Sequence, residues 1–94
     1  MGGMANIEVQ TLAPTRFEVT VAAGSTTTHE VTAAPDYVEN LTGDAHQGAE
    51  LVERSFAFLL EREPNTSILR KFELPVIGSY FPEYEREMKK LFGS

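Results

Sequence analysis

The sequence has no cysteine, and this absence excludes disulfide bonds, thiolate metal sites and cysteine nucleophiles. It also has no apolar run that approaches the roughly 18 residues of a membrane-spanning helix. Its N-terminus lacks the basic, apolar and small-residue regions of a signal peptide. We therefore expect a soluble cytoplasmic protein with no membrane partner.

Basic residues are scarce in the first half of the chain. Residues 1–45 contain six acidic side chains and one basic side chain, Arg16, which gives −5 of the total net charge of −6. An acidic half of this kind repels phosphate backbones, so the sequence argues against nucleic acid as a partner. Acidity of this size more often serves solubility than a specific function.

The composition is that of an ordinary globular domain. Hydrophobic residues make up 41% of the chain and charged residues 23%, which argues against overall disorder. Its 94 residues predict a single domain, 1–94, with a small core. Residues 1–5 and 93–94 are expected to be disordered or left over from cloning.

The stretch DAHQGAELVERSFAFLLERE predicts a central helix from Asp44 to Glu63. Asp44 is a suitable N-cap, and Gln47 three residues later would complete a capping-box-like pair. Pro64 ends the helix because it disfavours helical geometry at the preceding residue and has no amide proton. The apolar arc is about 200° wide, which predicts burial on two sides, against a sheet and against further helices.

Thr15–Ala33 predicts a β-hairpin, because apolar and polar residues alternate on its first half and threonines fill its second. A two-residue loop would set Val19 opposite Glu30. A three-residue loop at Gly24–Thr26 would set Val19 opposite Val31, and we prefer it because it keeps the apolar side chains on one face. Ile7 and Val9 alternate with polar residues, as in a third strand, but Pro14 interrupts the pattern. The sequence therefore leaves open whether this strand forms.

Short helices are expected in the rest of the chain. Ala34-Pro35-Asp36 starts one that presents Tyr37, Val38 and Leu41 inward, with Gly43 as its C-cap. The stretches SILRKF (with Ile68, Leu69 and Phe72 inward), PVIGSY and PEYEREMKKLF predict three more. The fold class is therefore α+β: an N-terminal hairpin, or a three-stranded antiparallel sheet if the strand around Ile7 and Val9 forms, packs on a central helix. Short C-terminal helices follow.

The block SFAFLLEREPNTSILRKFELPVIGSYFPEYERE resembles a family of small, acidic, uncharacterised prokaryotic proteins. Its members pair a Thr-rich N-terminal hairpin with an ending of the LLEREP…SIL…F.L.VI..YFPEY kind. The resemblance covers residues from about 15 to 88 and implies the same fold and a single domain. It carries over no catalytic residue. The chain departs from the family at Pro75, where a Ser-like helix cap is expected.

Motifs for chemistry are few. His29 and His46 are the two histidines, and we expect both at the surface, because neither has a second ligand at metal-binding spacing. Glu61, Arg62 and Glu63 form the densest polar cluster. We expect Arg62 to cover the last carbonyls of the central helix and Glu63 to pair locally. No catalytic residue, metal ligand or cofactor is predicted.

Two hypotheses for function follow. The first is a non-enzymatic protein-interaction or adaptor module that binds another protein or a second copy of itself, a possible homodimer, through apolar residues of the tail: Tyr80, Tyr84, Met88, Leu91 and Phe92. The same helical face could instead close the protein's own core. The second hypothesis is a small enzyme or ligand-binding protein with a polar site at Glu61 and Arg62, near the end of the central helix.

Overall fold

The computed structural model describes residues 5–93. In chain order the elements are β1 (Asn6–Ala13), β2 (Arg16–Ala22), β3 (Thr26–Thr32), α1 (Pro35–Thr42), α2 (Gly48–Leu60), the 3₁₀ turn η1 (Asn65–Ser67), β4 (Lys71–Glu73), α3 (Val76–Tyr80) and α4 (Tyr84–Leu91). Of the terminal residues expected to be disordered, 1–4 and 94 lie outside the described residues. Ala5, in contrast, is partly buried against the core.

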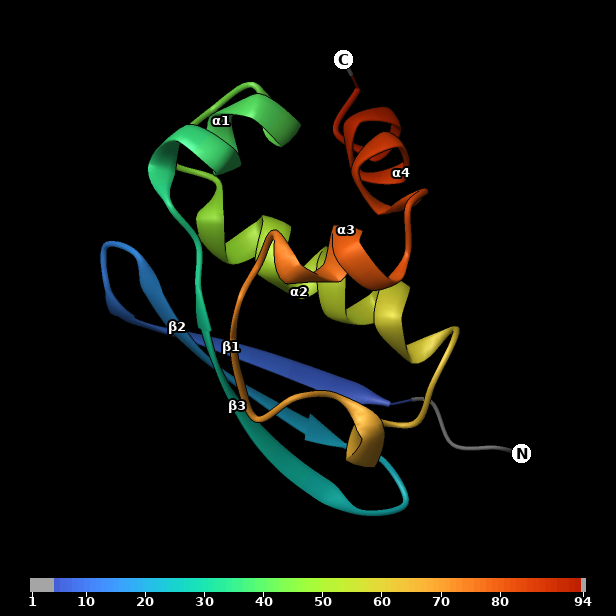
Figure 1. The fold of residues 1–94 in the computed structure, drawn as a ribbon. Helices are drawn as coiled ribbons and strands as arrows, with labels where there is room; N and C mark the ends of the chain where they lie inside the picture. Colours follow the sequence, from blue (N-terminus) through green and yellow to red (C-terminus); the bar gives the residue numbers. More distant parts are fainter. Residues whose placement is uncertain (1–4, 94) are drawn as a thin grey trace.

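The α+β class is confirmed, and Figure 1 shows the sheet as one layer with the helices gathered on one of its faces. Within residues 5–93 the sheet has four strands in the order β1-β2-β3-β4. The first three are antiparallel neighbours, and β4 runs parallel to β3. β1 is thus the third strand that the alternation of Ile7 and Val9 left open, and Pro14 lies in the turn that follows it.

The hairpin register differs from the expected one. Val19 lies opposite His29, and Val31 lies opposite Phe17, because the three-residue loop spans Ala23–Ser25 and begins one residue earlier than expected. Moving the loop by one residue moves every partner by two, so the inward and outward faces are unchanged. Val19 and Val31 are both fully buried, as a loop of odd length requires.

The outer face of the hairpin places two carboxylates directly opposite each other. Glu18 and Glu30 are cross-strand partners, an arrangement that like charges disfavour. The Arg16 guanidinium lies 4.0 Å from Glu30, and both side chains are well exposed. Solvent screening and this cation therefore offset the repulsion.

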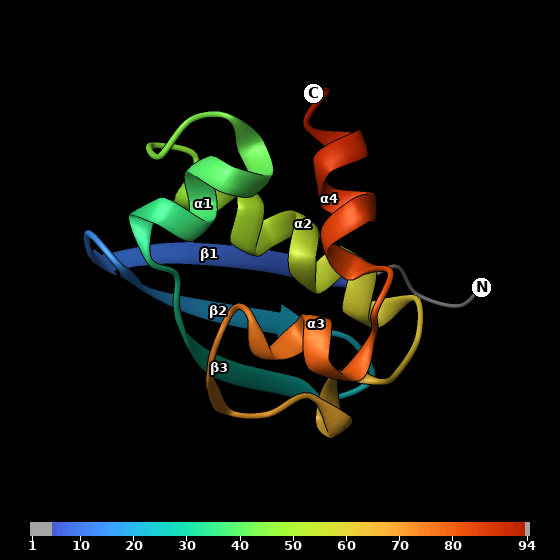
Figure 2. The ribbon, with the colours of Figure 1, turned by 45° about the horizontal axis from the view of Figure 1, so that its top comes forward.

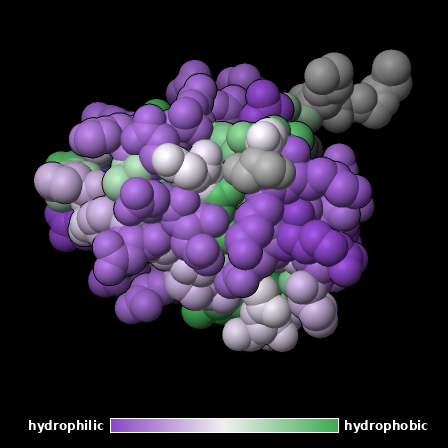
Figure 3. Space-filling model, turned by 90° about the horizontal axis from the view of Figure 1, so that it is seen from above, coloured by the Kyte–Doolittle hydropathy of each residue, from purple (hydrophilic) through white to green (hydrophobic). Residues whose placement is uncertain are grey.

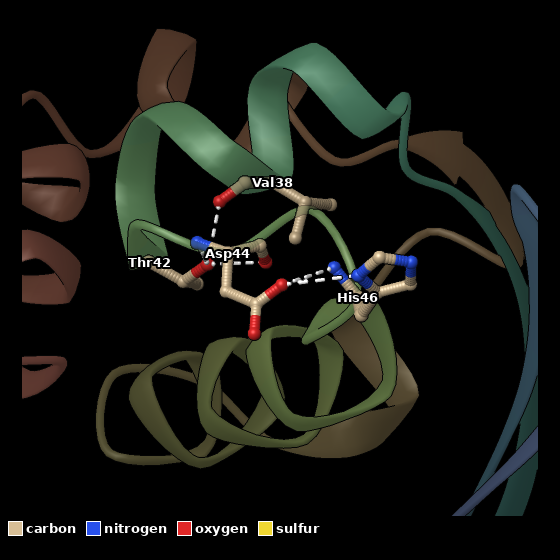
Figure 4. Close-up of polar contacts among 4 residues, drawn as sticks. All are labelled: Val38, Thr42, Asp44 and His46. Carbon is tan, nitrogen blue, oxygen red and sulfur yellow. Dashed lines mark hydrogen bonds and ion pairs between the residues drawn. The ribbon is translucent and has the colours of Figure 1, made fainter.

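The central helix is shorter than predicted, and the capping box is wrong. α2 begins at Gly48 with Gln47 at the N-cap, and no side chain caps it. Asp44 forms a turn instead: its Oδ1 accepts the His46 amide N–H at 2.9 Å (Figure 4). Its carbonyl accepts the Gln47 amide N–H at 3.0 Å. The Asp44 amide donates to the Thr42 hydroxyl at 3.0 Å, which joins this turn to the end of α1, and that hydroxyl donates to the Val38 carbonyl at 2.8 Å.

Burial of α2 on two sides is confirmed. Its buried side chains include Leu51, Val52, Ser55, Phe56, Phe58 and Leu59. Figure 2 shows the helix lying above the sheet with α1 and α4 on its other side. α1 also matches its prediction, since Pro35 starts it, Val38 and Leu41 are buried, and Gly43 ends it with a φ of 86°.

The predicted SILRKF helix is wrong. The chain makes η1, then an extended stretch, and then β4, whose backbone bonds to β3. The Glu30 amide donates to the Arg70 carbonyl at 2.8 Å, and the Leu74 amide donates to the Thr32 carbonyl at 2.9 Å. These bonds satisfy backbone groups on the free edge of β3, a gain that outweighs the local helical pattern.

The tail forms two helices, as expected, and the second mostly closes the core. Tyr84 is fully buried with its hydroxyl 2.6 Å from that of Ser55, and Met88 is buried beside it. Leu91, by contrast, is 53% exposed. Seen from the end that carries α1 and α4, the surface is mostly hydrophilic (Figure 3). Phe92 is partly buried against the core, so the core alternative accounts for Tyr84, Met88 and Phe92 but not for Leu91.

Candidate functional site

The candidate site is a pocket of about 220 Å³ beside the C-terminal end of α2. Three elements form its walls: the end of α2, the segment from η1 into β4, and α3. The lining residues are Leu59, Glu63, Ser67, Ile68, Leu69, Phe72, Val76, Ile77, Tyr80 and Phe81.

The pocket exists because the chain turns sharply twice around it. Pro64 stops α2, and the backbone then runs to the edge of the sheet. Pro75 starts α3, which runs back towards the end of α2. Ile68, Phe72 and Ile77 are buried by these turns and form the floor. The return leaves a gap between α3 and the segment leading into β4.

Two large apolar side chains of the lining stay in water. Leu69 is 48% exposed and Tyr80 is 67% exposed. Single exposed apolar residues are common on proteins, but two that line one apolar pocket are of the kind found at binding sites. The expected inward position of Leu69 is therefore wrong.

Polar groups are few in this pocket, and one of them is charged. Glu63 contributes the carboxylate, while Ser67 and Tyr80 contribute hydroxyls. The expected local pairing of Glu63 is wrong, since its carboxylate has no cation within 4.0 Å among residues 5–93. A carboxylate beside an apolar pocket favours a ligand that carries a positive charge next to an apolar group.

Arg62 is engaged outside the pocket. Its guanidinium carbon lies 3.6 Å from the centroid of the Phe58 ring, and Nη1 donates to the Phe58 carbonyl at 2.9 Å. Nε donates to Glu83 at 3.3 Å, and Nη1 reaches Glu61 at 3.4 Å. The prediction that Arg62 covers the last carbonyls of the helix is confirmed, and the residue also joins α2 to the start of α4.

The electrostatics around Arg62 fit this structural role. The pKa of Glu83 is lowered, first by a hydrogen bond from its own backbone amide and then by the hydrogen bond from Arg62. Glu61 and Arg62, the polar site expected from the sequence, do not line the pocket; Glu63 does. The predicted place, near the end of the central helix, is thus occupied by a pocket with different polar groups.

The residues expected in an interaction surface are divided by the fold. Tyr80 lines the pocket, whereas Tyr84 and Met88 are buried in the core. Leu91 and the partly buried Phe92 lie at the far end of α4. The apolar floor of the pocket was missed, because in the sequence its residues look like the inward faces of two short helices.

His29 is buried, and the expectation of a surface position is wrong. Its Nδ1 donates to the Leu69 carbonyl at 2.8 Å, and its Nε2 accepts from the Thr27 hydroxyl at 2.8 Å. The Asn65 amide donates to the same hydroxyl oxygen at 2.8 Å, so the network ties β3 to the pocket wall. Burial lowers the pKa of His29, and the positive charge of Arg70 acts in the same direction.

A sequence signal for this position did exist. His29 has the same parity as Val31 on its strand, so the alternation that directs Val31 inward also directs the imidazole inward. His46, by comparison, is almost fully exposed beside Asp44, as expected.

No protein-family model, curated protein or solved structure matches this chain. The family resemblance carried by the SFAFLLEREP…YFPEYERE block therefore stays a prediction. Among the described residues, no helix is long and apolar enough to cross a membrane.

Proposed function

We propose that this protein is a non-enzymatic interaction module that binds another protein by taking one of its large apolar side chains into the pocket beside α2. The observation that carries the proposal is the apolar pocket bordered by exposed Leu69 and Tyr80. Interfaces typically depend on a few such anchor side chains seated in pockets, with aromatic residues enriched among them.

The size of the pocket favours a single side chain over a larger ligand. Its volume of about 220 Å³ exceeds the roughly 150 Å³ of an engineered cavity that binds benzene. It is smaller than the roughly 300–1,000 Å³ of pockets that bury drug-sized ligands. One phenyl ring or one long aliphatic side chain fits this range.

The charge of the pocket suggests which residues flank the anchor side chain in the partner's sequence. Glu63 supplies a carboxylate without a described cation, and the chain as a whole carries a net charge of −6. A lysine or arginine next to the anchor would meet this carboxylate and the acidic surroundings. The partner segment we propose is therefore a large apolar residue flanked by basic residues.

The second hypothesis, a small-ligand-binding protein, has the same pocket in its favour. A free aromatic amine would place its ring among the apolar residues and its ammonium group near Glu63. Tyr80 supplies a hydroxyl for orientation. The two hypotheses differ in whether backbone contacts on either side of the anchor add affinity.

The test is an NMR titration of the ¹⁵N-labelled protein with a blocked pentapeptide, Ala-Lys-Phe-Lys-Ala. We expect saturable shifts centred on Leu69, Ile77 and Phe81. Replacing the peptide's phenylalanine with alanine removes the anchor and keeps the charge, while replacing its lysines with glutamate keeps the ring and reverses the charge. Both changes should abolish the shifts.

Two protein variants complete the design. Tyr80→Ala removes an exposed side chain at little cost to folding and should weaken peptide binding about fivefold or more, the effect of roughly 1 kcal/mol. Glu63→Gln should remove the preference for lysine over glutamate in the peptide. Phenylethylamine binding as tightly as the peptide would support the small-ligand hypothesis. Absence of saturable shifts from either probe would contradict both.

A further inference from the structure

Within residues 5–93, the sheet has one long edge strand without a second partner, β1. β1 has eight residues and pairs with β2 alone, whereas the other edge strand, β4, has three residues. Among residues 5–93, none of the backbone hydrogen bonds outside the helices and the sheet involves Asn6–Ala13. The outward N–H and C=O groups of this strand are therefore available to a further strand.

The side chains of β1 have the features of an edge that lacks a neighbour. Ile7 and Val9 face the helix layer but are half-buried, whereas their partners on β2, Val21 and Val19, are fully buried. No lysine or proline interrupts the strand, and these are common means of blocking an edge. The bulge at Leu12 limits the flat part to residues 6–11.

We propose that a second copy of this chain pairs with β1 antiparallel and in a two-fold arrangement centred on Val9. Residues that lie opposite each other in the two β1 strands must point to the same face of the sheet, so few registers are allowed. Centring on Glu8 would place two carboxylates face to face. Centring on Val9 places Glu8 opposite Gln10, and Ile7 opposite Thr11, at both ends of the symmetric pairing.

This register makes β1 complementary to itself. Glu8 and Gln10 are exposed on the outer face, where an amide can donate to a carboxylate across the strands. On the inner face, the paired strands would cover the exposed parts of Ile7 and Val9. The result is a continuous eight-stranded sheet in which the helices of both copies lie on one side.

The absence of cysteine makes the register directly testable. In the double variant Glu8→Cys/Gln10→Cys, opposite Cβ atoms come within about 5.5 Å, close to disulfide range. In each single variant the two thiols lie diagonally, at about 7–8 Å, and do not bond. Mild oxidation should therefore give a covalent dimer from the double variant and leave both single variants monomeric.

Sedimentation measures the association itself. The wild type should dimerise reversibly at protein concentrations up to about 1 mM. Gln10→Glu places carboxylates opposite each other twice and should weaken the dimer about 2- to 30-fold, whereas Gln10→Lys should tighten it by a similar factor. Since Gln10 also faces Glu18 on β2, circular dichroism of each variant verifies that the monomer is folded.

The outcomes separate this proposal from that of the pocket, which lies at the other edge of the sheet. A monomer at every concentration would overturn the β1 pairing and leave the pocket proposal intact. A dimer that is insensitive to both Gln10 variants and lost in Tyr80→Ala would place the association at the pocket and also overturn the pairing. Equal crosslinking of single and double cysteine variants would contradict the register.

Discussion

Replacing His29 with leucine should destabilise the protein and change how its stability depends on pH. The imidazole is fully buried between β3 and the pocket wall, with its ring centroid 5.2 Å from that of Phe56. The Leu69 carbonyl can only accept, so Nδ1 carries the proton and Nε2 accepts from the Thr27 hydroxyl. Leucine keeps most of the volume and loses both hydrogen bonds.

The magnitude follows from the groups left behind. The partly buried Leu69 carbonyl loses its imidazole partner, at about 1–3 kcal/mol. The Thr27 hydroxyl loses its acceptor but keeps the bond from Asn65, so its share is at the lower end of the same range. We expect His29→Leu to lower the free energy of unfolding by about 2–4 kcal/mol at neutral pH.

Protonation should weaken the same network in the wild type. With a proton on Nε2, both the imidazole and Asn65 would donate to the Thr27 oxygen, and the hydroxyl proton would lose its acceptor. Burial already lowers the pKa of His29 from 6.5 in the folded state. The unfolded chain therefore binds more protons below that pH, so this stability is complete above pH 6.5 and is lost as the pH falls towards the folded-state pKa.

The assay is urea unfolding followed by far-UV circular dichroism at about pH 7.5 and about pH 5.5. The difference in unfolding free energy between wild type and His29→Leu should shrink as the pH falls. His46→Ala is the control for replacing an exposed histidine, and it should change the free energy of unfolding little at about pH 7.5. A difference for His29→Leu that stays constant across this range would refute the proposed protonation linkage.

Three further changes test the fold. Truncation after Phe81 removes buried Tyr84 and should unfold the domain, seen as loss of a cooperative thermal transition; a cooperative transition would show that α4 is dispensable. Arg62→Met keeps the apolar stem but loses the cation–π contact and the ion pairs, so urea unfolding should report a loss of about 1 kcal/mol. Gly43→Ala should lower the free energy of unfolding by about 1–2 kcal/mol because Gly43 has a φ of 86°. The same change at Gly24, which has open space around it, should be nearly neutral. Equal effects of the two changes on urea unfolding would contradict the argument from backbone strain.

The sequence was enough to place the elements that depend on residues close together in the chain. Pro35 and Gly43 mark the two ends of α1 in the sequence, and the structure keeps both. The alternation of Val19 with polar neighbours assigned the faces of the hairpin, although the partner across the strand was wrong. Face depends on parity alone, whereas register also depends on which residues make the turn.

The pocket illustrates what local chemistry leaves open. Apolar spacing in SILRKF allows a helix, yet the same residues form β4 and the stretch before it, because β3 offers an edge some 40 residues earlier in the chain. Once that pairing forms, the Leu69 side chain is exposed at the pocket while its carbonyl accepts a hydrogen bond from His29 Nδ1. Neither outcome can be inferred from the segment alone.

The sequence by itself determined the α+β class, the inward positions of Val19 and Val31 in the hairpin, α1, the apolar arc of α2 and the role of Arg62 at its end. Tertiary structure alone decided the fourth strand, the hydrogen bond from His29 to the Leu69 carbonyl and the position of Glu63 at the pocket. The physical reason is range: turns, caps and alternation act within a few residues, whereas hydrogen bonds between distant strands and desolvation exist only after the chain has folded.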